Sequence, residues 1–272
     1  MRVRRARGLV AAYIDRVTGP SSFAATEPLP RTWAQTRAAW GSGDWLAVVS
    51  IPVVFLVAYL STQVFGEGRA VIVIDALVRV VLCVAVLALY RHLLRAHWQR
   101  FRRRFWLNAG LVVLGAVLMQ VVVSLVRAVV PAGGAGGAAG GADDAALIDP
   151  VTAQGWDLVV LLVATLGPLA IVLVEEAVFR HTLLVKLPLW GNRLVATAGV
   201  LLNGALFGAV HYYNFGSLVG TVPYMVVGVL FNLVYLWRRN LWHVLLMHFL
   251  NNFVLSFGAL SFVLLMRALG AV

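Results

Sequence analysis

Two adjacent carboxylates, Glu175 and Glu176, and a nearby Arg180 lie inside an apolar run that extends from about Leu158 to Leu187. A run of this length predicts a membrane-spanning helix. Ionised groups in such a helix cost about 3 kcal/mol each on insertion scales, and they usually mark function. Glu176 and Arg180 share one helix face and can form an ion pair. Glu175 lies about 100° around the helix, so its carboxylate is left available as a general base.

Two further polar motifs occur in later apolar runs. Gly204 and Gly208 form a small-xxx-small pattern that lets helices approach closely, and His211 follows on roughly the same face. His248 and Asn252 are spaced so that they share a face of the next run. Both side chains can donate hydrogen bonds, and both are costly to leave unpaired in lipid.

Together these groups are equipped to hydrolyse a peptide bond. Glu175 and His211 can activate a water molecule. His248 and Asn252 can donate hydrogen bonds to the oxyanion of a tetrahedral intermediate. The sequence contains no Gly-x-Ser-x-Gly elbow and no His-Glu-x-x-His motif, so neither an esterase-type serine nor a zincin site is indicated.

A metal-dependent alternative uses the same groups. Glu175, His211 and His248 could ligate zinc, because three protein ligands plus water form a catalytic zinc pattern. We favour metal-free glutamate chemistry without a cofactor and keep zinc as the alternative.

The composition predicts the elements that must position these groups. The chain is 61% hydrophobic and only 12% charged, whereas soluble domains are nearer half apolar and a quarter charged. Several uncharged runs of about twenty residues predict an all-α fold, a polytopic integral membrane bundle of seven to eight transmembrane helices. The short alternating strands of a membrane β-barrel are not found.

Composition divides the chain into four segments. Residues 1–43 form a basic cytoplasmic leader that can include an amphipathic helix on an anionic leaflet. Residues 44–130 hold three predicted spans, residues 131–157 form a Gly/Ala/Asp-rich linker, and residues 158–272 form the catalytic core. Gly167-Pro168 should bend the helix before the glutamates. The last run, Leu241 to Leu269, predicts either one long helix or a break near Ser256 to Gly258 with an eighth segment after it.

Charge indicates the orientation of the chain. The net charge of +11 arises from arginines between the apolar runs, which the positive-inside rule explains without nucleic acid. The leader and the arginine-rich loop 91–104 are predicted inside, where they can contact anionic lipid, and the linker outside. This pattern predicts a cytoplasmic membrane, of a bacterium, with the N-terminus inside. His92 and His97 are predicted to be solvated or to face headgroups, and His243 to lie at the membrane interface. Asp75 and Arg79 are predicted to pair.

Three motifs occur in order on successive predicted membrane helices: Glu175-Glu176-x-x-x-Arg180, Phe207-x-x-x-His211 and His248-x-x-x-Asn252. This series resembles the CAAX prenyl protease and bacteriocin-processing (CPBP) family of intramembrane endopeptidases over about residues 158–256. The resemblance implies an eight-helix bundle around a cavity that opens to the cytoplasmic side. It implies Glu175 and His211 on the catalytic water. It implies His248 and Asn252 as oxyanion donors, with Glu176, Arg180 and Phe207 in supporting positions.

Several functions are compatible with these motifs. The favoured one is an endopeptidase that acts on a membrane-associated protein or a peptide. The alternatives are a catalytically silent scaffold or bacteriocin-immunity protein of the same fold, and a proton-coupled transporter, which would predict an inverted repeat that is not found. One point fits poorly. His211 lies near the outer end of its predicted helix, about Leu194 to Tyr213, whereas His248 lies nearer the inner end. For His211 and His248 to meet, the helix that carries His211 must begin deeper in the membrane or be strongly tilted.

Overall fold

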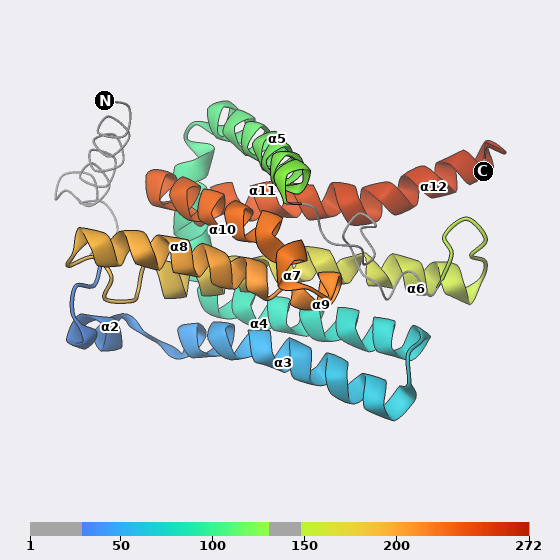
Figure 1. The fold of residues 1–272 in the computed structure, drawn as a ribbon, viewed down its shortest axis with the longest axis horizontal. Coiled ribbons are helices and arrows are strands. Elements are labelled where there is room, and N and C mark those ends of the chain that lie inside the picture. Colours follow the sequence, from blue (N-terminus) through green and yellow to red (C-terminus); the bar gives the residue numbers. More distant parts are fainter. Residues whose placement is uncertain (1–28, 131–147, 272) are drawn as a thin grey trace.

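A computed structural model of the chain describes residues 29–130 and 148–271 (Figure 1). All regular elements within these residues are helices, and no strand occurs among them. The predicted all-α membrane bundle is therefore confirmed. The amphipathic helix expected in the leader and most of the Gly-rich linker fall on residues 1–28 and 131–147, outside the described residues.

The helices have the following bounds in chain order: α2 Trp33–Ala39, α3 Ser42–Phe65, α4 Arg69–Arg102, α5 Phe105–Val129, α6 Trp156–Ala164, α7 Leu166–Glu176, the π-helix η2 Ala177–Leu184, α8 Arg193–Ala209, α9 Tyr212–Phe215, α10 Leu218–Arg238, α11 Leu241–Phe253, the π-helix η3 Val254–Gly258 and α12 Ala259–Ala268. Six runs within the described residues are long and apolar enough to cross a membrane, namely α3, α4, α5, α6 to η2, α10 and α11 to α12. The apolar α8 is shorter, with 17 residues. At the end of the chain, η3 occupies the position where a break was considered, and the helical run continues through it.

Helix α4 is longer than predicted. The sequence predicted a span of about Ala70 to Tyr90 followed by a loop, but α4 continues to Arg102 and has 34 residues. The arginine-rich stretch also has a buried apolar face at helical spacing, formed by Tyr90, Leu94, His97 and Phe101. The loop prediction was wrong because the arginines on the other face concealed this periodicity.

His97 does not face headgroups as predicted but is buried against the start of α11. Its Nδ1 accepts a hydrogen bond from the backbone N–H of Leu241 at 3.0 Å. Asn240 donates in return to the carbonyl of His97 at 2.9 Å. Nearby, the indole of Trp242 donates to the carbonyl of Leu94 at 2.8 Å. The extension of α4 therefore anchors the N-terminus of the helix that carries His248.

The run that carries the two glutamates is interrupted twice. Helix α6 ends at Ala164 and α7 begins at Leu166, close to the bend predicted at Gly167-Pro168, where proline lacks a backbone N–H. Directly after Glu176 the helix becomes the π-helix η2. π-Helical turns are rare in proteins, and those that occur are often found at functional sites.

Asp44 in the first turn of α3 ties the N-terminal helices to η2. Its Oδ1 accepts hydrogen bonds from Tyr90 on α4 and from Thr182 on η2, both at 2.9 Å. Its Oδ2 lies 2.9 Å from Nζ of Lys186. Asp44 and Thr182 are buried, so this cluster fixes the far end of η2 against α3 and α4.

Helices α8 and α10 lie side by side at very close range (Figure 1). A Cβ atom on Gly208 would lie 2.4 Å from the backbone nitrogen of Met225, and one on Gly204 would lie 2.6 Å from that of Val229. Only glycine permits this approach, as the small-xxx-small pattern predicted.

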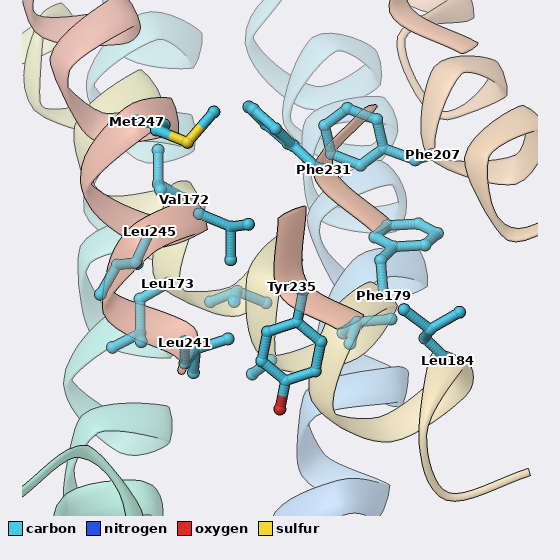
Figure 2. Packing of buried hydrophobic residues seen from close by; sticks show 14 of the residues in the cluster. Val172, Leu173, Phe179, Leu184, Phe207, Phe231, Tyr235, Leu241, Leu245 and Met247 are labelled. Carbon is cyan, nitrogen blue, oxygen red and sulfur yellow. The ribbon is translucent and has the colours of Figure 1, made fainter. Parts of the chain in front are cut away.

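The core lies between α7, η2, α8, α10 and α11. Figure 2 shows Phe179, Phe207 and Phe231 gathered on one side of this core, with Met247 and Val172 across from them. The Phe179 and Phe207 ring centroids are 5.4 Å apart and those of Phe207 and Phe231 are 6.0 Å apart. This aromatic group borders the polar residues described next.

Candidate active site

Glu175 and Glu176 form the last turn of α7, and Arg180 lies one turn further in η2. The side chains of Glu176 and Arg180 are both 0% exposed. Arg180 Nε lies 3.2 Å from Glu176 Oε2, so the predicted ion pair is present. Burying two unpaired charges in this position would be prohibitive, and the pair therefore holds the start of η2 in place.

Glu176 has a second partner that the sequence did not predict. Its Oε1 lies 2.9 Å from Nδ1 of His248. One carboxylate thus contacts an arginine on its own helical run and a histidine on α11, through different oxygens. A carboxylate on one ring nitrogen fixes the orientation of an imidazole and leaves the other nitrogen for chemistry.

That other nitrogen faces Glu175. Nε2 of His248 lies 3.6 Å from Oε2 of Glu175, which is longer than a hydrogen bond. Glu175 has no other ion pair or hydrogen bond of its side chain within the described residues, and it is 8% exposed. The free carboxylate expected from the sequence is therefore Glu175, and it lies beside His248.

Arg180 is enclosed by aromatic rings. Its guanidinium carbon lies 4.1 Å from the ring centroid of Phe207 and 5.2 Å from that of Phe231. An Nη2 atom reaches the carbonyl of Gly228 at 3.5 Å. Desolvated cation–π contacts of this kind stabilise a buried guanidinium, and they make Phe207 part of the same unit as the Glu176–Arg180 pair.

Phe207 also contacts both site histidines. Its ring centroid lies 5.2 Å from that of His211 and 5.7 Å from that of His248. No hydrogen bond or ion pair joins His211 to Glu175 in the described part of the chain. The structure therefore brings Glu175, Glu176 and His248 into direct contact and places His211 next to them through Phe207.

His211 lies outside the helix that was predicted to contain it. Helix α8 ends at Ala209, and His211 precedes the four-residue α9 with φ −86° and ψ 8°. Many active-site residues have this sparsely populated conformation. Helix α8 begins at Arg193, close to the predicted start. The difference from the prediction is thus at the C-terminal end of α8, where the chain leaves the helix before His211.

Two contacts fix the His211 ring. Its Nδ1 lies 2.9 Å from the carbonyl of Phe207, and the ring stacks on Tyr224 with centroids 4.9 Å apart. Because a carbonyl only accepts, Nδ1 carries the proton and Nε2 of the neutral ring is an acceptor. Burial lowers the pKa of His211 below its ordinary value, and the nearby Glu175 carboxylate opposes this shift.

Asn252 makes different contacts. Its Nδ2 donates to the carbonyl of Pro168 at 2.9 Å, and its Oδ1 accepts from Asn251 at 3.1 Å. It makes no hydrogen bond with Glu175 or His248 among the described residues. Asn252 therefore lies on α11 one turn from His248, with one amide N–H still available.

The structure also gives the placement of the candidate zinc ligands. Within residues 29–130 and 148–271, no group of three or more His, Cys, Asp or Glu side chains is placed so that it could hold a metal ion. Glu175, His211 and His248 are thus not grouped as a ligand set among the described residues, and zinc stays a prediction.

Two other histidines are buried outside the site. His243 was predicted at the membrane interface but is buried, with Nε2 3.2 Å from Oδ1 of Asn108. The His243 side chain is buried because α4 and α5 cover the start of α11 at Asn240. His181 is buried in an edge-to-face contact with Tyr90 at 5.4 Å, away from the glutamates.

The aromatic walls of the site were missed from the sequence. Tyr224 and Phe231 lie in an apolar run of α10 whose pattern assigns them no role. Only the fold brings them to His211 and to Arg180. The Asp75–Arg79 pair, in contrast, is present as predicted, with 2.7 Å between Nε and Oδ2.

Comparison with known proteins identifies the segment that carries the site. Residues 155–254 match the family model described as type II CAAX prenyl endopeptidase Rce1-like. The core of this chain is similar to that Rce1-like family over these residues. The resemblance drawn from the three motifs is thereby confirmed. A search of curated proteins and a search of solved structures each gave no match.

The family and the fold agree on the general class of this protein. An Rce1-like core indicates a CAAX-type intramembrane protease. The apolar helices make the chain an integral membrane protein. The matched residues run from the start of α6 to the start of η3, so α3, α4 and α5 lie outside the matched segment.

Proposed function

We propose that this chain hydrolyses a peptide bond inside the membrane with water activated by Glu175 and His211, without a metal ion. The observation that carries the proposal is the unequal environment of the two glutamates. Glu176 is occupied by Arg180 and by Nδ1 of His248, whereas Glu175 keeps a free carboxylate beside Nε2 of the same histidine. A free, enclosed carboxylate is the group that can take a proton from water.

In the proposed reaction Glu175 moves the proton, and the other groups bind water or the oxyanion. Glu175 accepts a proton from a water molecule that Nε2 of His211 also binds, and the water oxygen attacks the scissile carbonyl carbon. The oxyanion that forms accepts hydrogen bonds from the remaining amide N–H of Asn252 and from Nε2–H of His248. In this step His248 carries protons on both ring nitrogens, because its Nδ1–H faces the Glu176 carboxylate that fixes its orientation. Glu175 then returns the proton to the leaving nitrogen, and the C–N bond breaks.

The proposed substrate is a membrane-associated protein or a peptide. The name of the matching family refers to prenylated proteins, so a prenylated C-terminus is the first substrate to test. Arginines exposed at the end of α4 and at the turn that follows support a contact with anionic lipid, as does the basic leader, and they indicate no nucleic-acid partner. We further propose a bacterial cytoplasmic membrane with the N-terminus inside.

The test compares membrane peptides from cells that carry the wild-type chain or Glu175→Gln. Peptides that depend on the wild type should disappear in Glu175→Gln. A matched control is Glu67→Gln, which changes an exposed glutamate in the connection between α3 and α4 and should leave the peptides unchanged. Equal peptide sets and an unchanged cellular phenotype in Glu175→Gln would contradict hydrolysis and favour a catalytically silent scaffold or immunity protein of this fold.

A further inference from the structure

Three side-chain amides form a continuous chain of hydrogen bonds across the bundle. Gln120 on α5 donates through Nε2 to Oδ1 of Asn251. Asn251 donates through Nδ2 to Oδ1 of Asn252 at 3.1 Å. Asn252 donates through Nδ2 to the carbonyl of Pro168 on α7 at 2.9 Å. This series of hydrogen bonds therefore joins α5, which lies outside the family-matched segment, to α7, which carries the two glutamates.

The last acceptor fixes the direction of the whole chain. A backbone carbonyl can only accept, so Asn252 must turn its NH₂ group toward Pro168 and its oxygen toward Asn251. Asn251 must then present its own NH₂ group to Asn252 and its oxygen to Gln120. Every amide is held in one of its two flip states, and Gln120 and Asn251 reinforce the orientation of Asn252 that the Pro168 carbonyl requires.

This arrangement leaves one free donor on Asn252. Its oxygen and one N–H are occupied, which fixes the plane of the carboxamide and keeps the second N–H pointing in one direction. An amide that flips would offer its oxygen to the oxyanion instead, and two negative oxygens repel. Donors fixed in advance are what makes an oxyanion site effective.

We propose that Gln120 and Asn251 are positioning residues that hold Asn252 in the donor orientation for catalysis. The inference rests on the proposed function, because it takes Asn252 as the oxyanion donor. It adds that α5, which the family match does not cover, contributes to the reaction.

These amide hydrogen bonds are not needed to attach α5 to α11. Helix α5 already packs against α11 at Gly115, where an added Cβ would lie 2.4 Å from the methyl carbon of Met247. Further along, Asn108 bonds to His243 at 3.2 Å. Gln120 itself is exposed and Asn251 is half-buried. The hydrogen bonds from Gln120 through Asn251 to Asn252 are thus better explained by a role in orienting the Asn252 amide than by a role in docking α5 on α11.

The experiment measures cleavage of a fluorogenic peptide that ends in a prenylated CAAX sequence, with purified full-length protein. Gln120→Leu and Asn251→Leu should each lower kcat about tenfold or more while KM stays unchanged, because a misoriented oxyanion donor affects the transition state. Ser124→Ala is the control, since it removes a polar group from an exposed position on the same helix and should leave kcat unchanged. In the Asn252→Ala background, Gln120→Leu should have no further effect, because the residue that it positions is gone.

Two results would overturn the inference. One is an unchanged kcat in both Gln120→Leu and Asn251→Leu. The other is an equal loss of kcat on adding Gln120→Leu to Asn252→Ala, which would indicate a structural role. Either result leaves the proposed function intact if Glu175→Gln still abolishes cleavage. Cleavage that persists in Glu175→Gln would instead contradict the proposed function itself.

Discussion

Nδ1 of His248 lies 2.9 Å from Oε1 of Glu176, closer than the 3.2 Å that separates Nε of Arg180 from the other oxygen of the same carboxylate. The fully buried Glu176 therefore contacts both Arg180 on η2 and His248 on α11, and links these two elements. This link explains why two adjacent glutamates are useful here. One is consumed in building the site, and its neighbour is left beside Nε2 of the histidine that it orients.

Exchanging each glutamate for glutamine should separate these two roles. Glu176→Gln leaves the buried Arg180 without its counter-charge, and we expect the free energy of unfolding to fall by about 3 kcal/mol. Glu175→Gln removes only a loose 3.6 Å contact and should unfold like the wild type while cleavage is lost. Thermal unfolding in detergent and a cleavage assay measure the two effects. Equal unfolding of both variants would contradict the assignment.

Gly208→Ala should separate α8 from α10. The added methyl group would lie 2.4 Å from the backbone nitrogen of Met225, and a backbone cannot move aside as a side chain can. We expect a loss of about 1–3 kcal/mol in the free energy of unfolding, together with lower activity because His211 follows α8. Gly110→Ala is the matched control, since no atom lies within 4 Å of its Cβ position. A stable, active Gly208→Ala variant would argue against this close packing.

Asp44→Asn tests the cluster that holds the far end of η2. The substitution keeps the size of the side chain but replaces one of its two acceptor oxygens with an NH₂ group, which cannot accept from the donors around Asp44. It also leaves Lys186 without its ion pair. We expect the free energy of unfolding to fall by about 2 kcal/mol. Asp157→Asn serves as the control, because its partner Arg69 is largely exposed and such pairs contribute little. Indistinguishable unfolding of the two variants would show that the Asp44 cluster adds no stability.

The acid limb of the pH–rate profile should report His211. Because burial lowers the pKa of His211, its ring stays neutral at neutral pH and can bind a water proton. The rate should fall only when the pH drops below the ordinary histidine value of about 6.5. Tyr224→Ala removes the ring that stacks on His211 and should move this limb to higher pH, because the imidazolium is then better solvated.

The control for that experiment is Tyr59→Ala, which removes a 60% exposed tyrosine on α3. Its acid limb should coincide with that of the wild type. An acid limb that Tyr224→Ala does not move would exclude His211 as the group that titrates.

The sequence was sufficient for contacts that lie within one helical turn. The pairs Asp75–Arg79 and Glu176–Arg180 follow from helix geometry, and the small-xxx-small pattern at Gly204 and Gly208 predicted close packing without naming the partner helix. Hydrophobicity located the spans because lipid demands long apolar runs.

Contacts between distant parts of the chain could not be predicted in this way. Asp44 meets Lys186 across 142 positions, and the N–H of Leu241 meets His97 across 144. Neither pair has a spacing that a single helix would reveal. The end of α8 was also missed, because no proline or glycine between Ala209 and Phe215 marks it.

The length of α4 has a consequence for the supply of water. Its 34 residues extend about 50 Å at 1.5 Å per residue, whereas the hydrocarbon layer is about 30 Å thick. The surplus lies at the arginine-bearing end, where Leu241 starts α11 against His97. His248 follows two turns later, so under the proposed function the water that is consumed would cross only a short distance from the headgroup layer. The proposed reaction would therefore need no pore through the whole bilayer.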